Sequence, residues 1–360
     1  MMSRINLLRK KMAEKDLPCF LVFNQYNITY VSGFTGHAAT VLITPQHNYL
    51  LTDYRYFEQA VKEATDFNVI CRDRVKQSLA SLINELVEAE QIDTLGFESS
   101  HVSVQQWHEI SAALNETHVV ATTRLIEDLR YIKDEQEISA IKQAAHIADQ
   151  ALADLVPQIK AGVTERELAL ALDHKMAQLG SQAPAFDTIL LFGERSALPH
   201  GVPSERELQR GDLVLIDFGA TVDGYRSDMT RTFVYGEASE QQKAIYQTVL
   251  TAQQSAIAAI EEGVTGDHLN QVSAEVLNAS DYAQYQGEGL GHGVGLELHE
   301  FPFIGKGCSL TVEQGCVITI EPGIYIPGWG GIRIEDDVVL TAQGLTIINA
   351  SPKSLQVLGD

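Results

Sequence analysis

Two aspartates flank a predicted hairpin turn in the segment DLVLIDFGATVDGYRSDMTRTFV (212–234). The Asp-Gly dipeptide at 223–224 favours a two-residue turn between antiparallel strands. If it forms the loop, Asp217 faces position 230, and Asp228 is its diagonal neighbour on the same face, roughly 7 Å away. Two buried carboxylates this close destabilise a fold unless a cation neutralises them. For the pair alone, a turn-capping Asp217 and a solvated Asp228 remain the more frequent arrangement.

Two glutamates repeat this pattern in the segment CVITIEPGIYIPGWGGIRIEDDVVLT (316–341). Glu321 ends one β-rich run, and Glu335 is predicted to lie inside the next. The proline and glycine residues between them indicate a long connection whose register the sequence leaves open. Each glutamate alone is more often a surface strand residue, but the aspartates upstream favour a shared site.

Two histidines lie in the glycine-rich segment GEGLGHGVGLELHE (287–300). His292 and His299 are seven residues apart, so a regular strand would send them to opposite faces. The spacing is also not that of the HExxH zinc helix. The glycines permit an irregular backbone that brings both imidazoles to one centre and leaves room for a substrate. A lone histidine is more often a hydrogen-bonded core residue, and a dinucleotide loop is excluded because no GxGxxG followed by a helix is present.

Taken together, these segments supply an oxygen-rich donor set with a single imidazole. Its members are Asp217, Asp228, Glu321 and Glu335, together with one of the two histidines. Such a set suits manganese, cobalt or zinc in a two-metal site better than a tetrahedral structural zinc. Two cations about 3.5 to 4 Å apart can share a hydroxide, make it nucleophilic near neutral pH and polarise a carbonyl. The predicted chemistry is hydrolysis.

The first third of the chain alternates helix and strand signals. Ser3 is predicted to cap a helix, CFLVF (19–23) reads as a buried strand, and residues 39–53 read as two strands about a turn containing proline. These patterns predict a compact α/β domain. The charged segment RLIEDLRYIKDE (124–135) then opens a long helix, which places the expected domain boundary between residues 128 and 129.

The second part begins with helices and continues as strands. Apolar residues recur every three or four positions from Ile138 to Leu155, and Thr164 with Glu167 forms a predicted capping box for a helix that ends at Gly180. Beyond residue 186 the pattern changes to strands and glycine turns. We therefore expect an α+β domain over residues 129–360, with helices packed on a mostly antiparallel sheet.

Composition excludes several partners. The chain has 360 residues, long enough for two domains, and 26 Lys and Arg against 48 Asp and Glu give a net charge of −22. This acidity argues against nucleic acid and anionic membranes as partners, because phosphate binding needs a basic surface. The sequence has no apolar run of membrane-spanning length and no apolar core of a secretion signal near its start. The four scattered cysteines fit a reducing cytoplasm.

The ordered motifs identify the chain as resembling the pita-bread metallopeptidases of family M24, and within them the Xaa-Pro peptidases, aminopeptidase P and prolidase. The motifs are ALPHG, LIDFGATVDGYRSDMTRT, GHGVGLELHE, TIEPGIY and GIRIED. The segment YVSGFTGHAATVLITPQHNYLLTDYRYFEQA resembles their amino-terminal domain. The resemblance implies an α+β pita-bread catalytic domain over 129–360, preceded by a smaller creatinase-like α/β domain over 1–128.

The same resemblance implies a dinuclear metal centre. By this resemblance the ligands would be Asp217, Asp228, His292, Glu321 and Glu335. Asp228 and Glu335 would bridge two divalent ions, Asp217 would bind one ion, and His292 with Glu321 would bind the other. We expect Mn²⁺, with Co²⁺ and Zn²⁺ as alternatives. A homodimer is also implied.

Further site residues follow from the resemblance. His200 and His299 would be catalytic and substrate-binding, donating hydrogen bonds to the scissile carbonyl and the developing oxyanion. Glu321 would also be catalytic, handling the proton of the attacking hydroxide. Arg333 would orient an acidic ligand or the carboxyl side of the substrate. Asp53, with its neighbours Arg55 and Tyr56, is more consistent with packing than with a contact near the site.

The expected activity is metal-dependent cleavage, in the cytoplasm, of the bond before a proline in position two of small peptides. We favour the aminopeptidase P type over the prolidase (Xaa-Pro dipeptidase) alternative, because the stretches GFTGHAATVLIT and LLTDYRY look more like it. The full ligand set argues against the metal-free creatinase type, and a non-catalytic peptide-binding module is a more distant alternative. One position departs from many relatives: Glu288 stands where they have histidine, which suggests a preference for a free amino terminus.

Overall fold

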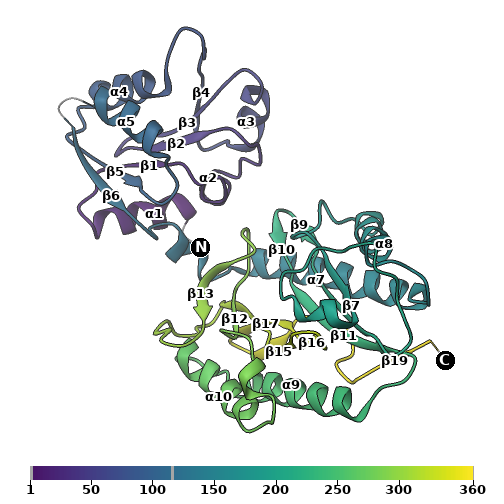
Figure 1. Ribbon diagram of the computed structural model, residues 1–360. Helices are drawn as coiled ribbons and strands as arrows, with labels where there is room; N and C mark the ends of the chain where they lie inside the picture. The colour runs from purple at the N-terminus through teal and green to yellow at the C-terminus, as the bar shows by residue number, and fades with distance from the viewer. Residues whose placement is uncertain (1–2, 115–116, 360) are drawn as a thin grey trace. The chain divides into compact units, whose positions relative to one another are not determined.

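The computed structural model describes residues 3–114 and 117–359 (Figure 1). The contacts within the chain fall into two compact units, Met1–Arg130 and Tyr131–Asp360. Among the described residues, no helix combines the length and the apolar character that crossing a bilayer requires.

The first unit is built on one six-stranded mixed sheet with the order β4-β3-β2-β1-β5-β6. Strand β1 pairs antiparallel with β2 and parallel with β5. The strands are β1 (Cys19–Val22), β2 (Thr40–Ile43), β3 (Asn48–Thr52), β4 (Asn68–Cys71), β5 (Thr94–Glu98) and β6 (His118–Thr122). The helices are α1 (Arg4–Ala13), α2 (Gln25–Ser32), α3 (Phe57–Glu63), α4 (Leu79–Ala89), α5 (Val104–Ala113) and α6 (Glu127–Arg130).

The local predictions for this unit are confirmed. The side chain of Ser3 accepts the N–H of Asn6 and caps α1. Strand β1 lies inside the predicted buried run, and β2 and β3 form a hairpin around the predicted turn. Helices α4 and α5 pack on β1 and β5 through a shared apolar cluster, in which the Phe97 and Trp107 rings stack 3.7 Å apart.

The second unit contains two larger sheets and two short ribbons. The sheets have the orders β19-β11-β8-β7 and β13-β12-β14-β17-β18, and the ribbons are β10-β9 and β15-β16. The strands are β7 (Ile189–Phe192), β8 (Leu213–Phe218), β9 (Thr221–Val222), β10 (Tyr225–Arg226), β11 (Met229–Tyr235), β12 (Gly291–Gly293), β13 (Glu300–Ile304), β14 (Val317–Ile320), β15 (Gly323–Ile326), β16 (Gly330–Arg333), β17 (Asp336–Thr341), β18 (Gly344–Ile347) and β19 (Val357–Leu358). Apart from β11 with β19, the pairings are antiparallel, as expected.

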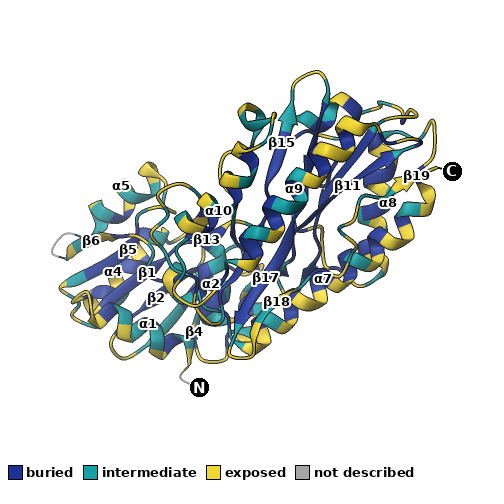
Figure 2. Ribbon diagram, turned by 90° about the horizontal axis from the view of Figure 1, so that it is seen from below, coloured by how far each residue is buried: buried dark blue, intermediate teal, exposed yellow. Residues whose placement is uncertain are grey.

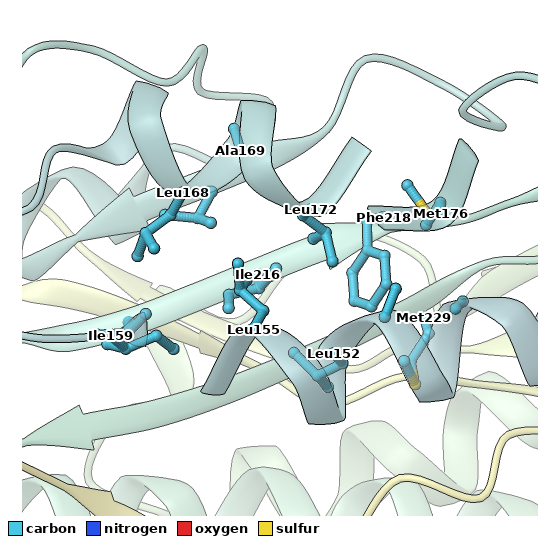
Figure 3. Packing of buried hydrophobic residues seen from close by; sticks show 14 of the residues in the cluster. Leu152, Leu155, Ile159, Leu168, Ala169, Leu172, Met176, Ile216, Phe218 and Met229 are labelled. Atoms are coloured by element: carbon cyan, nitrogen blue, oxygen red, sulfur yellow. The ribbon is translucent and has the colours of Figure 1, made fainter. Parts of the chain in front are cut away.

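Helices cover these sheets. They are α7 (Glu135–Leu155), η1 (Val156–Gln158), α8 (Glu165–Gln178), η2 (Gly193–Ala197), α9 (Glu240–Ala258), α10 (Gly266–Asn278) and η3 (Ala283–Tyr285). Leucines of α7 and α8 point toward β8 and β11 and form one apolar core with them (Figure 3). The predicted Thr164–Glu167 capping box is present at the start of α8. Figure 2 shows β11 and β17 buried beneath helices whose outer faces are exposed.

The hairpin that carries the two aspartates has the predicted register. Asp217 pairs with Thr230 along the β8–β11 ladder, and Val222 pairs with Tyr225 around the turn. Asp223 and Gly224 both have positive φ, at 50° and 80°, as a tight turn of this kind requires. The turn residues therefore set which face of β8 carries Asp217.

The prediction that Glu335 lies inside a strand is wrong. Residues 316–341 form four strands instead of two, and Glu335 lies in the gap between β16 and β17. The connection after Glu321 folds into the β15–β16 ribbon, in which Ile326 pairs with Gly330. Because β16 belongs to this ribbon and β17 to the five-stranded sheet, the chain passes from one sheet to the other at Ile334 and Glu335, which leaves Glu335 between strands.

Candidate metal centre

Asp217 and Asp228 are both buried, with 8% and 4% of their surfaces exposed. Asp217 lies on β8, and Asp228 directly precedes β11. Among the described residues, Oδ1 of each aspartate has no hydrogen-bond partner. Burying a carboxylate oxygen without a hydrogen-bond donor lowers the stability of the fold. These two oxygens therefore indicate a binding partner, such as a cation, that the protein itself does not supply.

His292 lies on β12, where the pairing with β13 shifts register by a bulge after this residue. Its Nδ1 is 3.0 Å from the carbonyl oxygen of Gly293, which can only accept, so Nδ1 carries a proton and Nε2 is the nitrogen that faces the acids of the pocket. Nε2 lies 3.3 Å from Glu321 Oε1 and 3.6 Å from Asp228 Oδ2. This tautomer is the one that binds a metal through Nε2.

The glycines around His292 are required by close backbone contacts. A Cβ added at Gly291 would lie 2.1 Å from the carbonyl oxygen of Thr319, and one at Gly293 would lie 2.3 Å from that of Phe301. No side chain fits at such distances. The prediction that glycine allows an irregular backbone beside the histidines is therefore confirmed at these two positions.

Glu321 and Glu335 approach from two further segments. Glu321 directly follows β14 and receives a hydrogen bond from the hydroxyl of Thr319 at 3.2 Å. Glu335 is 1% exposed and receives one from the hydroxyl of Thr230 at 2.6 Å. The chain thus brings the five predicted donors into one pocket from β8, the start of β11, β12, the end of β14 and the β16–β17 connection, with Asp228 and Glu321 just outside their strands.

The pKa values in the pocket are shifted because several acids are buried close to one another. Burial, followed by repulsion from Glu335 and Asp217, raises the pKa of Asp228 well above its usual value. Burial and repulsion from Glu321 and Asp217 do the same to the pKa of Glu335. Burial also lowers the pKa of His292, but the adjacent Glu321 carboxylate more than offsets this and the pKa is raised.

Three of these residues form a group with metal-binding geometry. One donor atom from each of Asp228, His292 and Glu335 lies within 4.8 Å of the other two. Unpartnered oxygens, mutually repelling acids and a correctly oriented imidazole all fit a divalent cation. Oxygen donors with one nitrogen suit a hard or borderline ion.

Arg333 contacts Asp217. Its guanidinium forms an ion pair with Asp217 Oδ2 and donates to the hydroxyls of Thr230, at 2.9 Å, and Tyr325, at 2.7 Å. Its side chain is 4% exposed. Arg333 was predicted to orient either an acidic metal ligand or the carboxyl side of the substrate. In the structure it contacts an acidic residue, Asp217.

The remaining predicted residues line the same pocket, which has a volume of about 570 Å³. The His299 ring lies edge-on to that of His292 with centroids 4.4 Å apart. Burial and the nearby His292 lower the pKa of His299, which favours its neutral form. His200 and Glu288 are exposed at this pocket. Asp53, by contrast, is paired with Arg55 within the first unit.

Sequence reasoning missed three residues of this site. Tyr325 and Thr230 hold Arg333, and Asp337, fully buried, accepts the backbone N–H of Asp228 at 2.8 Å. The predicted register already placed Thr230 opposite Asp217, so its proximity was accessible. Asp337 is the last residue of the acidic run EDD (335–337), and Tyr325 lies in the apolar run GIYI (323–326). Neither the residue type nor the spacing distinguishes these two residues from their neighbours.

Comparisons with known proteins agree with this geometry. Residues 139–342 match the family described as metallopeptidase family M24, and residues 4–132 match the creatinase/prolidase N-terminal domain. The Xaa-Pro dipeptidase of Pyrococcus horikoshii is 36% identical, covering 99% of both chains.

Solved structures are similar over the whole chain. The Xaa-Pro dipeptidase from Bacillus anthracis superposes with a TM-score of 0.94 at 38% identity, covering 99% of each chain. The X-Pro aminopeptidase from Thermotoga maritima gives a TM-score of 0.92 at 38% identity, covering 99% of this chain and 100% of the other. The expected pita-bread fold and peptidase resemblance are confirmed, and the chain belongs to metallopeptidase family M24, with a creatinase/prolidase domain at its amino-terminal end.

Proposed function

We propose that this metallopeptidase is an Xaa-Pro dipeptidase that hydrolyses the bond between a first residue and a following proline. The observation that carries the proposal is the pair of buried aspartates, Asp217 and Asp228, each with an oxygen that no described residue satisfies, in a pocket shared with His292, Glu321 and Glu335. Burying several carboxylates in one pocket destabilises the fold, and a bound cation would remove this cost.

The five donors would hold two divalent metal ions, and Asp228 and Glu335 would contribute to both sites. Asp217 would hold one ion, and His292 with Glu321 the other. The bound ions would supply Lewis-acid polarisation of the scissile carbonyl and a water molecule that ionises near neutral pH. Arg333 and Thr230 would keep Asp217 and Glu335 oriented through the contacts described above.

The protein's own groups would complete the reaction. Glu321, at the pocket wall, would accept the proton of the attacking water. His299 and His200 would donate hydrogen bonds to the carbonyl oxygen as negative charge develops on it, which a preorganised site stabilises more strongly than bulk water does. The lowered pKa of His299 is consistent with a neutral imidazole donor.

The pocket wall also suits a proline substrate. Apolar side chains of Phe186, Ile189, Leu298 and Phe303 line it beside the polar groups. An Xaa-Pro bond has no N–H, so a site that recognises it must rely on ring shape more than on an amide donor. An apolar wall of this kind provides that recognition.

The relatives favour the dipeptidase over the aminopeptidase P type that the motifs alone favoured. Xaa-Pro dipeptidases match over the full length of this chain at 36% and 38% identity. The aminopeptidase from Thermotoga maritima is equally similar, so an aminopeptidase is the second candidate. The two activities differ in whether the substrate extends beyond the proline.

Turnover on matched peptides tests the proposal. The purified protein, loaded with Mn²⁺, is assayed on Ala-Pro and Ala-Pro-Ala, and its metal content is measured by mass spectrometry. We expect about two ions per chain and a clear preference for Ala-Pro, and chelation should abolish cleavage. A preference for Ala-Pro-Ala would support the aminopeptidase instead, and cleavage of neither peptide would contradict both.

Three further properties belong to this proposal. We infer manganese as the physiological metal from the oxygen-rich donors, and a cytoplasmic location from the four free thiols, Cys19, Cys71, Cys308 and Cys316. We infer a homodimer from the family resemblance. The proposed domains, 1–128 and 129–360, are supported by the division of contacts between Arg130 and Tyr131.

A further inference from the structure

A buried ion pair lies next to the pocket and takes no part in the chemistry described so far. Lys133 Nζ is 2.9 Å from Glu300 Oε2, with side chains only 1% and 5% exposed. Relative to an apolar pair of similar size, a buried ion pair rarely adds stability, because both charges must leave water. Stability alone is therefore a weak explanation for this pair.

Glu300 holds the turn that carries His299. Its Oε1 accepts the backbone N–H of Glu297 at 3.0 Å, which closes residues 297–300 into a tight loop. The carboxylate packs on Gly295, where an added Cβ would lie 2.7 Å from Oε1. Because His299 directly precedes Glu300, the position of this carboxylate constrains the backbone from which the His299 ring reaches toward His292.

Lys133 is fixed at its own backbone. Its N–H donates to the carbonyl oxygen of Gly315 at 2.9 Å, and a Cβ at Gly315 would lie 2.8 Å from the carbonyl oxygen of Lys133. Gly315 stands just before β14, the strand that leads into Glu321. The ion pair therefore ties the His299 turn to the segment that carries another residue of the metal centre.

We propose that Lys133 and Glu300 are positioning residues that hold His299 in register with the metal centre. The inference rests on the proposed function, because the role of His299 belongs to it. A neutral residue at position 133 removes the ammonium group that lies 2.9 Å from the Glu300 carboxylate, and the turn that this carboxylate holds is then expected to rearrange. Displacements of about 1 Å at a catalytic group can reduce rates about 100-fold.

The kinetic test is a double-mutant cycle between Lys133→Met and His299→Ala, assayed on Ala-Pro with metal content and melting temperature recorded. We expect Lys133→Met alone to lower kcat about 10- to 100-fold at full metal content. In the His299→Ala background the same change should cost less than about twofold, because the group it positions is gone. An equal loss in both backgrounds would assign the pair a merely structural role and overturn the proposal.

Two further variants keep the cycle interpretable. Combining Lys133→Met with Glu300→Gln removes both charges and should restore much of the kcat lost by either single change; no restoration would count against the ion pair. Lys175→Met is the matched control, since Lys175 pairs with Asp154 on the exposed surface of the same unit at 2.7 Å. It should leave kcat unchanged, and a loss as large as that of Lys133→Met would contradict the specific role.

Hydrogen exchange provides a readout that does not depend on activity. In the metal-free protein, Lys133→Met should accelerate amide exchange across residues 294–300 while exchange in α7 stays as in the parent. Unchanged exchange in this turn would overturn the proposal even if the enzyme were active. If the parent cleaved no Xaa-Pro peptide, the proposed function would fail while the exchange result still tested the positioning of the turn.

Discussion

Glu98 in the first unit and Asp228 in the second are both buried carboxylates, but their surroundings are opposite. In the first unit, Glu98 accepts the backbone N–H groups of Phe23 and Asn24, both at 2.7 Å, and the side-chain amide of Asn27 at 2.6 Å, so both of its oxygens have donors. In the second unit, Asp228 Oδ1 has no donor among the described residues. Burial raises the pKa of both groups, that of Glu98 to about 7.

Burial and a raised pKa therefore do not by themselves distinguish a structural acid from a functional one. Burial alone is equally uninformative within the second unit, because Asp336 is fully buried yet accepts from Arg231 at 2.7 Å, Lys353 at 2.6 Å and Gln253 at 2.7 Å. What distinguishes Asp228 is an oxygen without a donor, facing other acids. A carboxylate in that state has its lone pairs available for a cation.

The largest expected difference between the two kinds of acid is in catalysis. Asp228→Ala should lower kcat/KM for an Xaa-Pro dipeptide by at least about 10³-fold, the upper end of the cost of losing one preorganised electrostatic group. Glu98→Gln, measured at a temperature where it stays folded, should change it less than about threefold, a difference below 1 kcal/mol. Comparable losses for both variants would remove the functional distinction.

Stability of the metal-free protein should change in opposite directions. Asp228→Asn removes one of several repelling buried acids and should raise the free energy of unfolding by about 1–3 kcal/mol, whereas Glu98→Gln places an amide donor against N–H donors and should lower it by a similar amount. Urea unfolding, followed separately in each unit by hydrogen exchange, measures both. A destabilising Asp228→Asn would mean that this aspartate is satisfied without metal.

The pH dependence of stability should depend on metal. Asp228 and Glu335 have folded-state pKa values above the usual range, and burial raises the pKa of Asp337 to about 8. Groups with raised folded pKa values stabilise the fold at low pH, and this contribution is lost as pH rises through those values. The metal-free protein should therefore lose at least about 1.4 kcal/mol, the worth of one pKa unit, between about pH 4 and pH 8.

The metal-loaded protein should show the reverse trend over the same range, because metal binding requires the deprotonated carboxylates. Calorimetric scans of both forms measure the two profiles. Glu98 contributes equally to the pH dependence of both forms. Subtracting one profile from the other therefore leaves the contribution of the second unit. Parallel profiles would show that the acids of the pocket are not linked to metal.

The smallest effect concerns the exposed acid at the pocket. Glu288→His should reduce the preference for a free over an N-acetylated first residue by no more than about fivefold, because exposed ion pairs contribute little. Relative kcat/KM values on the two peptides measure this. The idea that Glu288 attracts a free amino terminus fails if the variant and the parent show the same ratio.

Much of the fold and part of the site could be predicted from sequence because the determinants are local. The Asp-Gly turn set the pairing of Asp217 with Thr230, a continuous apolar run located β1, and helical periodicity and a capping box located α7 and α8. Glu335 was placed wrongly because the β-rich run around it was read as one strand, whereas the structure divides this run between β16 and β17, which belong to different sheets. Periodicity within a segment does not report where the segment bends.

The sequence by itself determined the donor types, the hairpin register and, through ordered motifs, the family. Only the tertiary structure decided that Arg333 reaches Asp217, that Asp337 supports Asp228, and that Lys133 meets Glu300 across 167 positions. Turns and strands follow from interactions between near neighbours, which the sequence displays directly. Contacts between distant segments depend on how whole sheets pack, and no single stretch of the chain encodes them.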